Sequence, residues 1–144
     1  MKAILLVDHG SRRRAANEML DCVARLVAYQ AGSGVVVRTA HLELAAPTVE
    51  DGMAACVAAG ADEIIVHPYM LSPGRHATKD LPAVVADVAT RLAVRARVTD
   101  PLGIHPLLGQ IVLERCGVAV SQPASRPVGG CPGDRRRCRA PWCQ

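Results

Sequence analysis

Apolar residues in this chain follow two alternating patterns: short continuous runs, and longer segments in which they recur every three or four positions. The short runs are typical of buried parallel strands, which we expect at 2–7, 35–42, 64–66 and 94–98. The longer segments predict helices at 15–29, 47–60, 78–92 and 104–116. This alternation predicts a single α/β domain with a doubly wound parallel four-stranded sheet and helices on both faces.

Several residues indicate where these elements begin and which positions face the core. Ser11 is expected to cap the first helix, and Pro47 is expected to open the second. Arg95 and Arg97 alternate along the fourth strand, which predicts an edge position. The residues expected on apolar helix faces are Met19, Leu20, Cys22, Val23, Leu26 and Val27, then Val49, Met53, Cys56 and Val57, then Leu81, Val84, Val85, Val88 and Leu92, and last Leu107, Leu108, Ile111 and Val112.

The net charge of +4 comes from the end of the chain. Residues 1–120 carry 12 Lys or Arg against 12 Asp or Glu, whereas 121–144 carry five Arg and one Asp. A neutral body with no Phe, one Trp and two Tyr does not favour nucleic-acid binding. The change to Pro, Gly, Arg and Cys predicts a domain at 1–117 and a disordered tail at 118–144.

The start of the chain does not look like an export signal. The apolar stretch after Lys2 is too short for a signal peptide and lacks a small-residue cleavage site, and no run is long enough for a membrane helix. We therefore expect a cytoplasmic protein with no membrane partner, whose cysteines are reduced or bind metal. The G-x-G-x-x-G, G-x-x-x-x-G-K-[ST] and G-x-S-x-G motifs are absent, so those nucleotide sites and that nucleophile are not supported.

Two of the five histidines follow predicted strands. His9 ends the first apolar run, and His76 lies in a Gly/Pro loop after the third. Because the carboxyl ends of parallel strands meet at one edge of a sheet, both imidazoles are expected at the edge where such folds bind ligands. Two imidazoles without a neighbouring cysteine suit a borderline divalent metal and leave coordination positions open. Taken singly, each histidine is as well explained by a polar turn or a solvated loop.

Further polar residues are predicted at the same edge. Glu43 follows the second strand and could be a third metal ligand or a proton acceptor, the alternative being an exposed carboxylate. The cations expected near this edge are Arg12, Arg13, Arg14, Arg75 and Lys79. Arginines in this position suit a ligand with several carboxylates, because a guanidinium binds a carboxylate through two hydrogen bonds. The alternative is an ordinary solvated helix start.

Together these segments resemble the short, single-domain sirohydrochlorin chelatases, the CbiX-type cobalt- and iron-inserting enzymes of the class II chelatase superfamily. The resemblance covers roughly residues 2–115. It rests on Leu-Val-Asp-His-Gly-Ser-Arg (6–12), Glu43-Leu44-Ala45-Ala46-Pro47, Pro68-Tyr69-Met70-Leu71, Gly74-Arg75-His76 and Asp80-Leu81-Pro82.

The resemblance implies a chelatase-like (flavodoxin-like) fold and a lyase that inserts Co²⁺, or alternatively Fe²⁺, into sirohydrochlorin in cobalamin or sirohaem biosynthesis. It implies that His9 and His76 bind the metal and assist proton removal, that Glu43 matches an acidic position of the family, and that the chain forms a homodimer. The carboxylate-rich macrocycle suits substrate contacts from Ser11, Arg12, Arg13, Arg75 and Lys79. The metal is a substrate and no tightly bound cofactor is expected. These ligands do not separate Co²⁺ from Fe²⁺ or Ni²⁺.

The cysteines near the end of the chain leave two interpretations open. Cys116, Cys131, Cys138 and Cys143 lack the spacing of a familiar zinc site, although some relatives of this type carry carboxy-terminal metal-binding or iron–sulfur extensions. We expect an unstructured tail. The alternative function is a non-catalytic cobalt, nickel or iron carrier; the cysteine tail favours carriage, whereas the arginines near His76 favour an anionic macrocycle.

Overall fold

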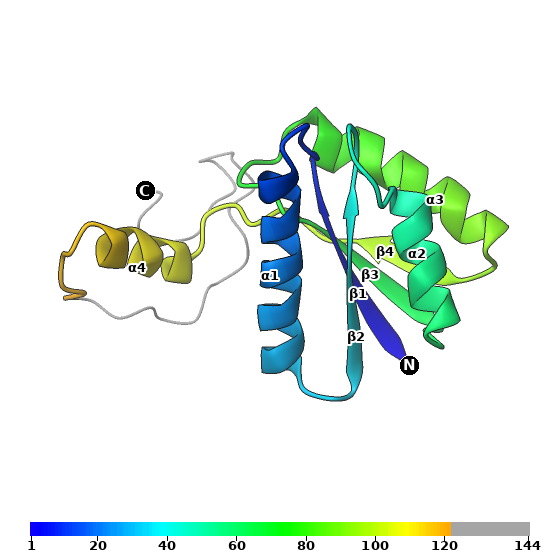
Figure 1. Ribbon diagram of the computed structural model, residues 1–144, viewed down its shortest axis with the longest axis horizontal. Helices are drawn as coiled ribbons and strands as arrows, with labels where there is room; N and C mark the ends of the chain where they lie inside the picture. The colour runs from blue at the N-terminus through cyan, green and yellow to red at the C-terminus, as the bar shows by residue number, and fades with distance from the viewer. Residues whose placement is uncertain (122–144) are drawn as a thin grey trace, which may run out of the picture.

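The computed structural model describes residues 1–121, which form four strands and four α-helices (Figure 1). In chain order these are β1 (Lys2–Asp8), α1 (Arg14–Ala31), β2 (Val35–His41), α2 (Val49–Ala58), β3 (Glu63–Pro68), a π-helical turn η1 (His76–Asp80), α3 (Leu81–Arg91), β4 (Arg95–Val98) and α4 (Pro106–Arg115). The strands are all parallel and lie in the order β2-β1-β3-β4. The predicted fold class is therefore confirmed, and so is the edge position of the strand that carries Arg95 and Arg97.

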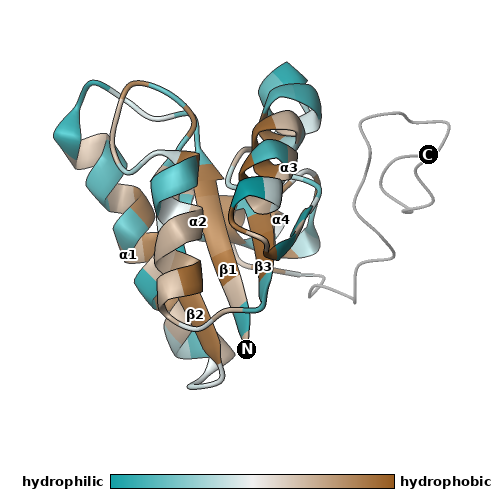
Figure 2. Ribbon diagram, turned by 90° about the vertical axis from the view of Figure 1, so that its right-hand side faces the viewer, coloured by the Kyte–Doolittle hydropathy of each residue, from teal (hydrophilic) through white to brown (hydrophobic). Residues whose placement is uncertain are grey.

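The two faces of the sheet have separate apolar cores. On one face α2 and α3 pack against the side chains of β1 and β3 that include Leu5 and Ile64. On the other face α1 packs Leu20 and Ala24 against Leu6 of β1 and the neighbouring positions of β2. Figure 2 shows much of β1, β2 and β3 in the hydrophobic colour. Helices pack on both sides of the central strand β1, and the polar residues that follow the strands lie at the carboxyl edge of the sheet.

The apolar face of α1 is rotated from the predicted one. Met19 and Leu26 are exposed, as is Cys22, so their assignment to the core is wrong. Leu20 and Ala24 are the buried residues of the helix, because α1 lies along β1 and β2 with that side inward. Cys56 of α2 does lie in the core, and burial raises the pKa of its thiol to about 11.

The starts of α1 and α2 also differ from the predictions. Ser11 is not the cap of α1: its Oγ accepts the backbone N–H of Arg13 (3.0 Å), and the helix begins at Arg14. Pro47 does not open α2, which begins after Thr48. Thr48 and Asp51 form a capping box in which each side chain accepts the other residue's backbone N–H (2.9 and 3.2 Å).

The last helix, α4, does not close the sheet as its apolar periodicity suggests. None of its residues is buried, and Figure 1 shows the helix lying away from the four strands. The segment before it is anchored to the loop after β3, because Leu102 N–H donates to Met70 O and Gly103 N–H donates to Leu71 O (both 2.9 Å). Within residues 1–121, none of the helices has both the length and the apolar character needed to cross a membrane.

Candidate functional site

His9 and His76 meet at the carboxyl edge of the sheet. His9 follows β1, and His76 begins η1 after the loop that leaves the neighbouring strand β3. Their ring centroids are 5.1 Å apart, and the ring planes cross at 86° in an edge-to-face arrangement. The parallel pairing of β1 with β3 is what brings together two side chains that lie far apart in sequence.

The turn that carries His9 is held against the loop after β2. Leu42 N–H donates to Asp8 O (2.9 Å) and Glu43 N–H donates to His9 O (3.0 Å), so hydrogen bonding continues past the strand ends. Gly10 has a φ of +84°, and a Cβ built on it would lie 1.8 Å from the carbonyl oxygen of Glu43. Only glycine permits both this backbone conformation and this close approach.

A part-buried hydrogen bond between side chains joins the same two strand ends. His41 is 3% exposed, and its Nδ1–H donates to Oδ1 of Asp8 at 2.6 Å. The same oxygen accepts the backbone N–H of Gly10 at 2.9 Å. Asp8 and His41 are paired in the register of β1 and β2. The sequence pattern alone did not lead to this pair. A signal for it was present, because Asp8 and His41 are polar residues that each end an apolar run.

Glu43 lies beside the histidines through its backbone, and its side chain is exposed. Within residues 1–121 no group of three or more His, Cys, Asp or Glu side chains is close enough together to hold a metal ion. The described site therefore consists of two imidazoles, and a ligand role for Glu43 stays a prediction. A metal held by two protein ligands keeps positions open for a substrate.

The loop that presents His76 is organised around one carbonyl group. Gly74 O accepts the backbone N–H groups of Ala77 and Thr78 and the hydroxyl of Thr78, each at 3.1 Å. The N–H of Leu81 then reaches back to His76 O, which gives the wide turn of a π-helix. Such turns are frequent at functional sites. The sequence pattern predicts only a helix from 78, so this turn is a feature that the structure adds.

The predicted substrate contacts lie around this edge. Arg12, Arg13 and Lys79 are exposed, and Ser11 is half-buried, with its backbone hydrogen-bonded to the Asn17 side chain. Arg75 is exposed, and its Nε lies 3.8 Å from Oδ1 of Asp80. A cavity of about 360 Å³ at the start of α1 is lined by residues that include Ser11, Arg12, Arg14 and His41.

The other histidines have structural contacts. His105 caps α4, its side chain accepting the N–H of Leu107 (3.1 Å). The hydroxyl of Thr99 donates to Asp100 O (3.0 Å), so the Nδ1–H of His67 donates to that hydroxyl (2.7 Å). This hydrogen bond agrees with the structural role that the position of His67 at a strand end suggests.

His67 is expected to make the stability of the fold sensitive to acid. Burial lowers the pKa of His67, so the folded chain binds a proton there less readily than the unfolded chain. The contribution of His67 to the free energy of unfolding is therefore largest above about pH 6.5. It decreases as the pH falls below that value and becomes constant below the lowered pKa of the folded chain. Urea unfolding between about pH 7.5 and about pH 5 should show a larger loss for the wild type than for His67→Gln. Equal losses would contradict this assignment.

Of the four cysteines predicted as a weak tail cluster, only Cys116 lies within the described residues. It is exposed and directly follows α4. Cys131, Cys138 and Cys143 lie outside the described residues, as does most of the predicted tail. The zinc and iron–sulfur alternatives stay predictions.

Comparison with known proteins decides the family. The CbiX family model matches residues 3–119. The chain belongs to the CbiX family. It is 41% identical over 113 residues to a chloroplastic sirohydrochlorin ferrochelatase of Arabidopsis thaliana, over 78% of this chain and 50% of that protein. It is 27% identical to a sirohydrochlorin cobaltochelatase of Methanopyrus kandleri, over 85% of this chain and 99% of that protein.

The solved structures agree with this assignment. A structure of SirB from Bacillus subtilis with Fe³⁺ matches with a TM-score of 0.70 and 36% identity, over 82% of this chain and 48% of that one. This chain spans about half the length of several curated relatives that it matches. The predicted membership of the CbiX type is confirmed.

Proposed function

We propose that this CbiX-family chain inserts a divalent metal ion into sirohydrochlorin. Co²⁺ is the leading candidate for this ion, and Fe²⁺ is the second. The observation that carries the proposal is the pair of imidazoles, His9 and His76, with ring centroids 5.1 Å apart at the carboxyl edge of the sheet. Relatives with both ferrochelatase and cobaltochelatase names match this chain. The choice between cobalamin and sirohaem biosynthesis follows from the metal, and imidazole accepts either ion.

The chemistry requires that the metal be held and then released to the ring. Two neutral imidazoles bind Co²⁺ or Fe²⁺ through their nitrogen lone pairs and leave the remaining positions to water and then to the pyrrole nitrogens. Insertion forms four metal–nitrogen bonds, and the ring releases its two N–H protons as the divalent ion takes their place. An imidazole that releases the metal can accept such a proton, and the exposed carboxylate of Glu43 is a second acceptor at the same edge.

The substrate brings negative charge to this edge. Ser11, Arg12, Arg13, Arg75 and Lys79 are proposed to contact the carboxylates of the macrocycle. Their exposure leaves the cationic groups accessible to a large ligand. A guanidinium binds a carboxylate through two parallel hydrogen bonds, which fixes the orientation of the ring as well as its affinity. The metal enters as a substrate, so no resident cofactor is part of the proposal.

The test is a chelatase assay with metal-free sirohydrochlorin and Co²⁺, Fe²⁺ or Ni²⁺ in turn, followed by absorbance. Enzyme-dependent formation of the metallated ring supports the proposal, and the most rapidly inserted ion identifies the metal. Metal binding without any acceleration of insertion, and without a change in the spectrum of added sirohydrochlorin, would instead support a metal carrier.

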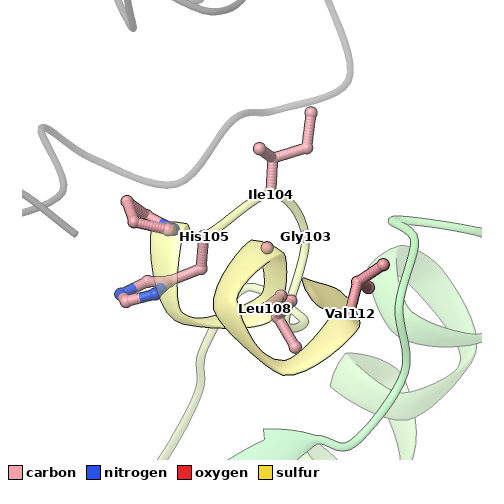
Figure 3. Close-up of a pocket in the computed structure, with 7 residues that line it drawn as sticks. Gly103, Ile104, His105, Leu108 and Val112 are labelled. Atoms are coloured by element: carbon pink, nitrogen blue, oxygen red, sulfur yellow. The ribbon is translucent and has the colours of Figure 1, made fainter. Parts of the chain in front are cut away.

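A homodimer is also proposed, through the apolar surface of α4. Ile111 and Val112 are 49% and 60% exposed, and a pocket of about 380 Å³ lies along the helix (Figure 3). The segment before α4 is hydrogen-bonded to the loop that leads to His76. A second copy packed on α4 would therefore lie beside the loop that carries one of the two imidazoles.

The cytoplasmic location stays a prediction.

Ile111→Glu is expected to weaken the dimer at least about tenfold, because burial of an isoleucine side chain contributes about 1.5–3 kcal/mol. Sedimentation over a range of protein concentrations measures the effect. Met19→Glu, which changes an exposed apolar residue of α1, is the matched control and should leave the dimer intact. A wild-type chain that stays monomeric, or a dimer that both variants weaken equally, would contradict an interface on α4.

A further inference from the structure

A carboxylate lies next to one of the two imidazoles and has no part in the function proposed so far. Oδ2 of Asp80 is 3.1 Å from Nδ1 of His76 across the π-helical turn η1. Asp80 immediately precedes α3 but makes no capping hydrogen bond with its side chain. Its other close charged neighbour is Arg75, whose Nε lies 3.8 Å from Oδ1. The carboxylate is therefore not explained as a helix cap.

The other atom of this contact, Nδ1 of His76, lacks a hydrogen-bond partner. Nδ1 of His76 is buried, and within the described residues it is the only buried side-chain nitrogen or oxygen without a hydrogen bond. The carboxylate of Asp80 lies 3.1 Å from this nitrogen, which is close enough for a hydrogen bond, but the angle between the two groups does not meet the requirement for one. Leaving a buried polar atom unpaired is unfavourable, so a small rotation that completes this hydrogen bond is favoured.

We propose that Asp80 is a positioning residue that holds the proton of His76 on Nδ1 and so leaves the lone pair on Nε2 for the metal. This inference rests on the proposed role of His76 in metal binding. A carboxylate that accepts the second N–H of a metal-binding histidine fixes the tautomer and the ring orientation and makes the binding nitrogen more basic. Arg75 orients the carboxylate from its other oxygen, in addition to any contact with substrate.

The surroundings of the pair limit how His76 can otherwise be held. The adjacent ring of His9 meets His76 edge to face and supplies no hydrogen bond to Nδ1. The backbone N–H of Leu81 donates to His76 O and so fixes the backbone of His76, but a backbone bond does not select a tautomer of the ring. Asp80 is the charged acceptor in the right place to do so.

The experiment compares Asp80→Asn and Asp80→Ala with Asp87→Asn, which changes an exposed carboxylate of α3 that pairs with Arg91. Nitrogen-15 NMR of the metal-free chain reads the tautomer of His76. Titration with Co²⁺ alone, without sirohydrochlorin, reads the affinity. Asp80→Ala is expected to shift His76 away from the Nδ1–H tautomer and to weaken Co²⁺ binding about 10- to 100-fold, with a smaller effect in Asp80→Asn.

The two readouts separate this inference from the proposed function. A wild-type chain that shows the Nδ1–H tautomer, lost on removal of the carboxylate, supports the positioning role even if the chain fails to insert a metal. An unchanged tautomer in both Asp80 variants, with Co²⁺ affinity equal to that of Asp87→Asn, would overturn it. If Asp80→Ala does not fold, the comparison of Asp80→Asn with Asp87→Asn decides the question.

Discussion

Replacing either imidazole, in His9→Ala or His76→Ala, is expected to lower the rate of metal insertion by about 100-fold or more. Each variant removes a ligand of the incoming ion and a base for the pyrrole protons. With one imidazole left in the described site, Co²⁺ affinity should fall as well. Initial rates of insertion and direct Co²⁺ titration measure the two effects on the same preparations.

The matched control is His105→Ala, which removes an imidazole that caps α4 rather than one that faces the other site histidine. It should retain Co²⁺ affinity close to that of the wild type. The fold should persist in His9→Ala, because the His9 side chain is exposed. Wild-type insertion rates in both His9→Ala and His76→Ala would show that metal transfer takes place elsewhere on the chain.

The meeting of these two histidines could be predicted because it depends on little more than the order of elements. Short apolar runs that alternate with helices predict parallel strands, and parallel strands direct their carboxyl ends to one edge. His9, which ends such a run, then lies at that edge, and the loop after the third run can bring His76 to the same edge. Neither the exact register nor the side-chain packing is needed for this argument.

The contacts around the histidines could not be predicted in the same way. The hydrogen bond from His41 to Asp8 exists because residue 41 is paired with residue 8 in the ladder between β1 and β2. A shift of one residue would turn one of them to the other face. Asp80 and His76 lie four residues apart, a spacing at which side chains meet on one helical turn, but the helix predicted from 78 starts after His76 and so does not join them.

The errors at α4 and at the start of α2 have different physical origins. The apolar periodicity of α4 indicates a side suited to burial, but it does not say which surface covers that side, and Leu107, Ile111 and Val112 are exposed. The start of α2 was within reach of the sequence, because Thr48 with Asp51 three residues later is a capping-box pattern. The start predicted at Pro47 is two residues too early, because Pro47 precedes the N-cap Thr48 rather than occupying the first helical position, where proline is favoured.

Gly10→Ala is expected to disrupt both the fold and the site. The left-handed backbone at this position alone costs a non-glycine residue about 1–3 kcal/mol. In addition, the new Cβ would overlap the carbonyl oxygen of Glu43 at 1.8 Å, and a backbone atom cannot move aside as a flexible side chain can. The turn after β1 would have to separate from the loop after β2, which breaks the bond from Glu43 N–H to His9 O.

Gly32→Ala isolates the contribution of this close approach. Gly32 has a φ of +79° and no atom within 4 Å of the position that a Cβ would occupy, so its substitution introduces backbone strain without overlap. Urea unfolding should show a substantially larger loss of stability for Gly10→Ala than for Gly32→Ala, and only Gly10→Ala should lose Co²⁺ affinity in its folded fraction. Equal losses in the two variants would mean that the turn of His9 can move away from Glu43 at little cost. The position of His9 would then depend on the Asp8–His41 hydrogen bond rather than on the contact at Gly10.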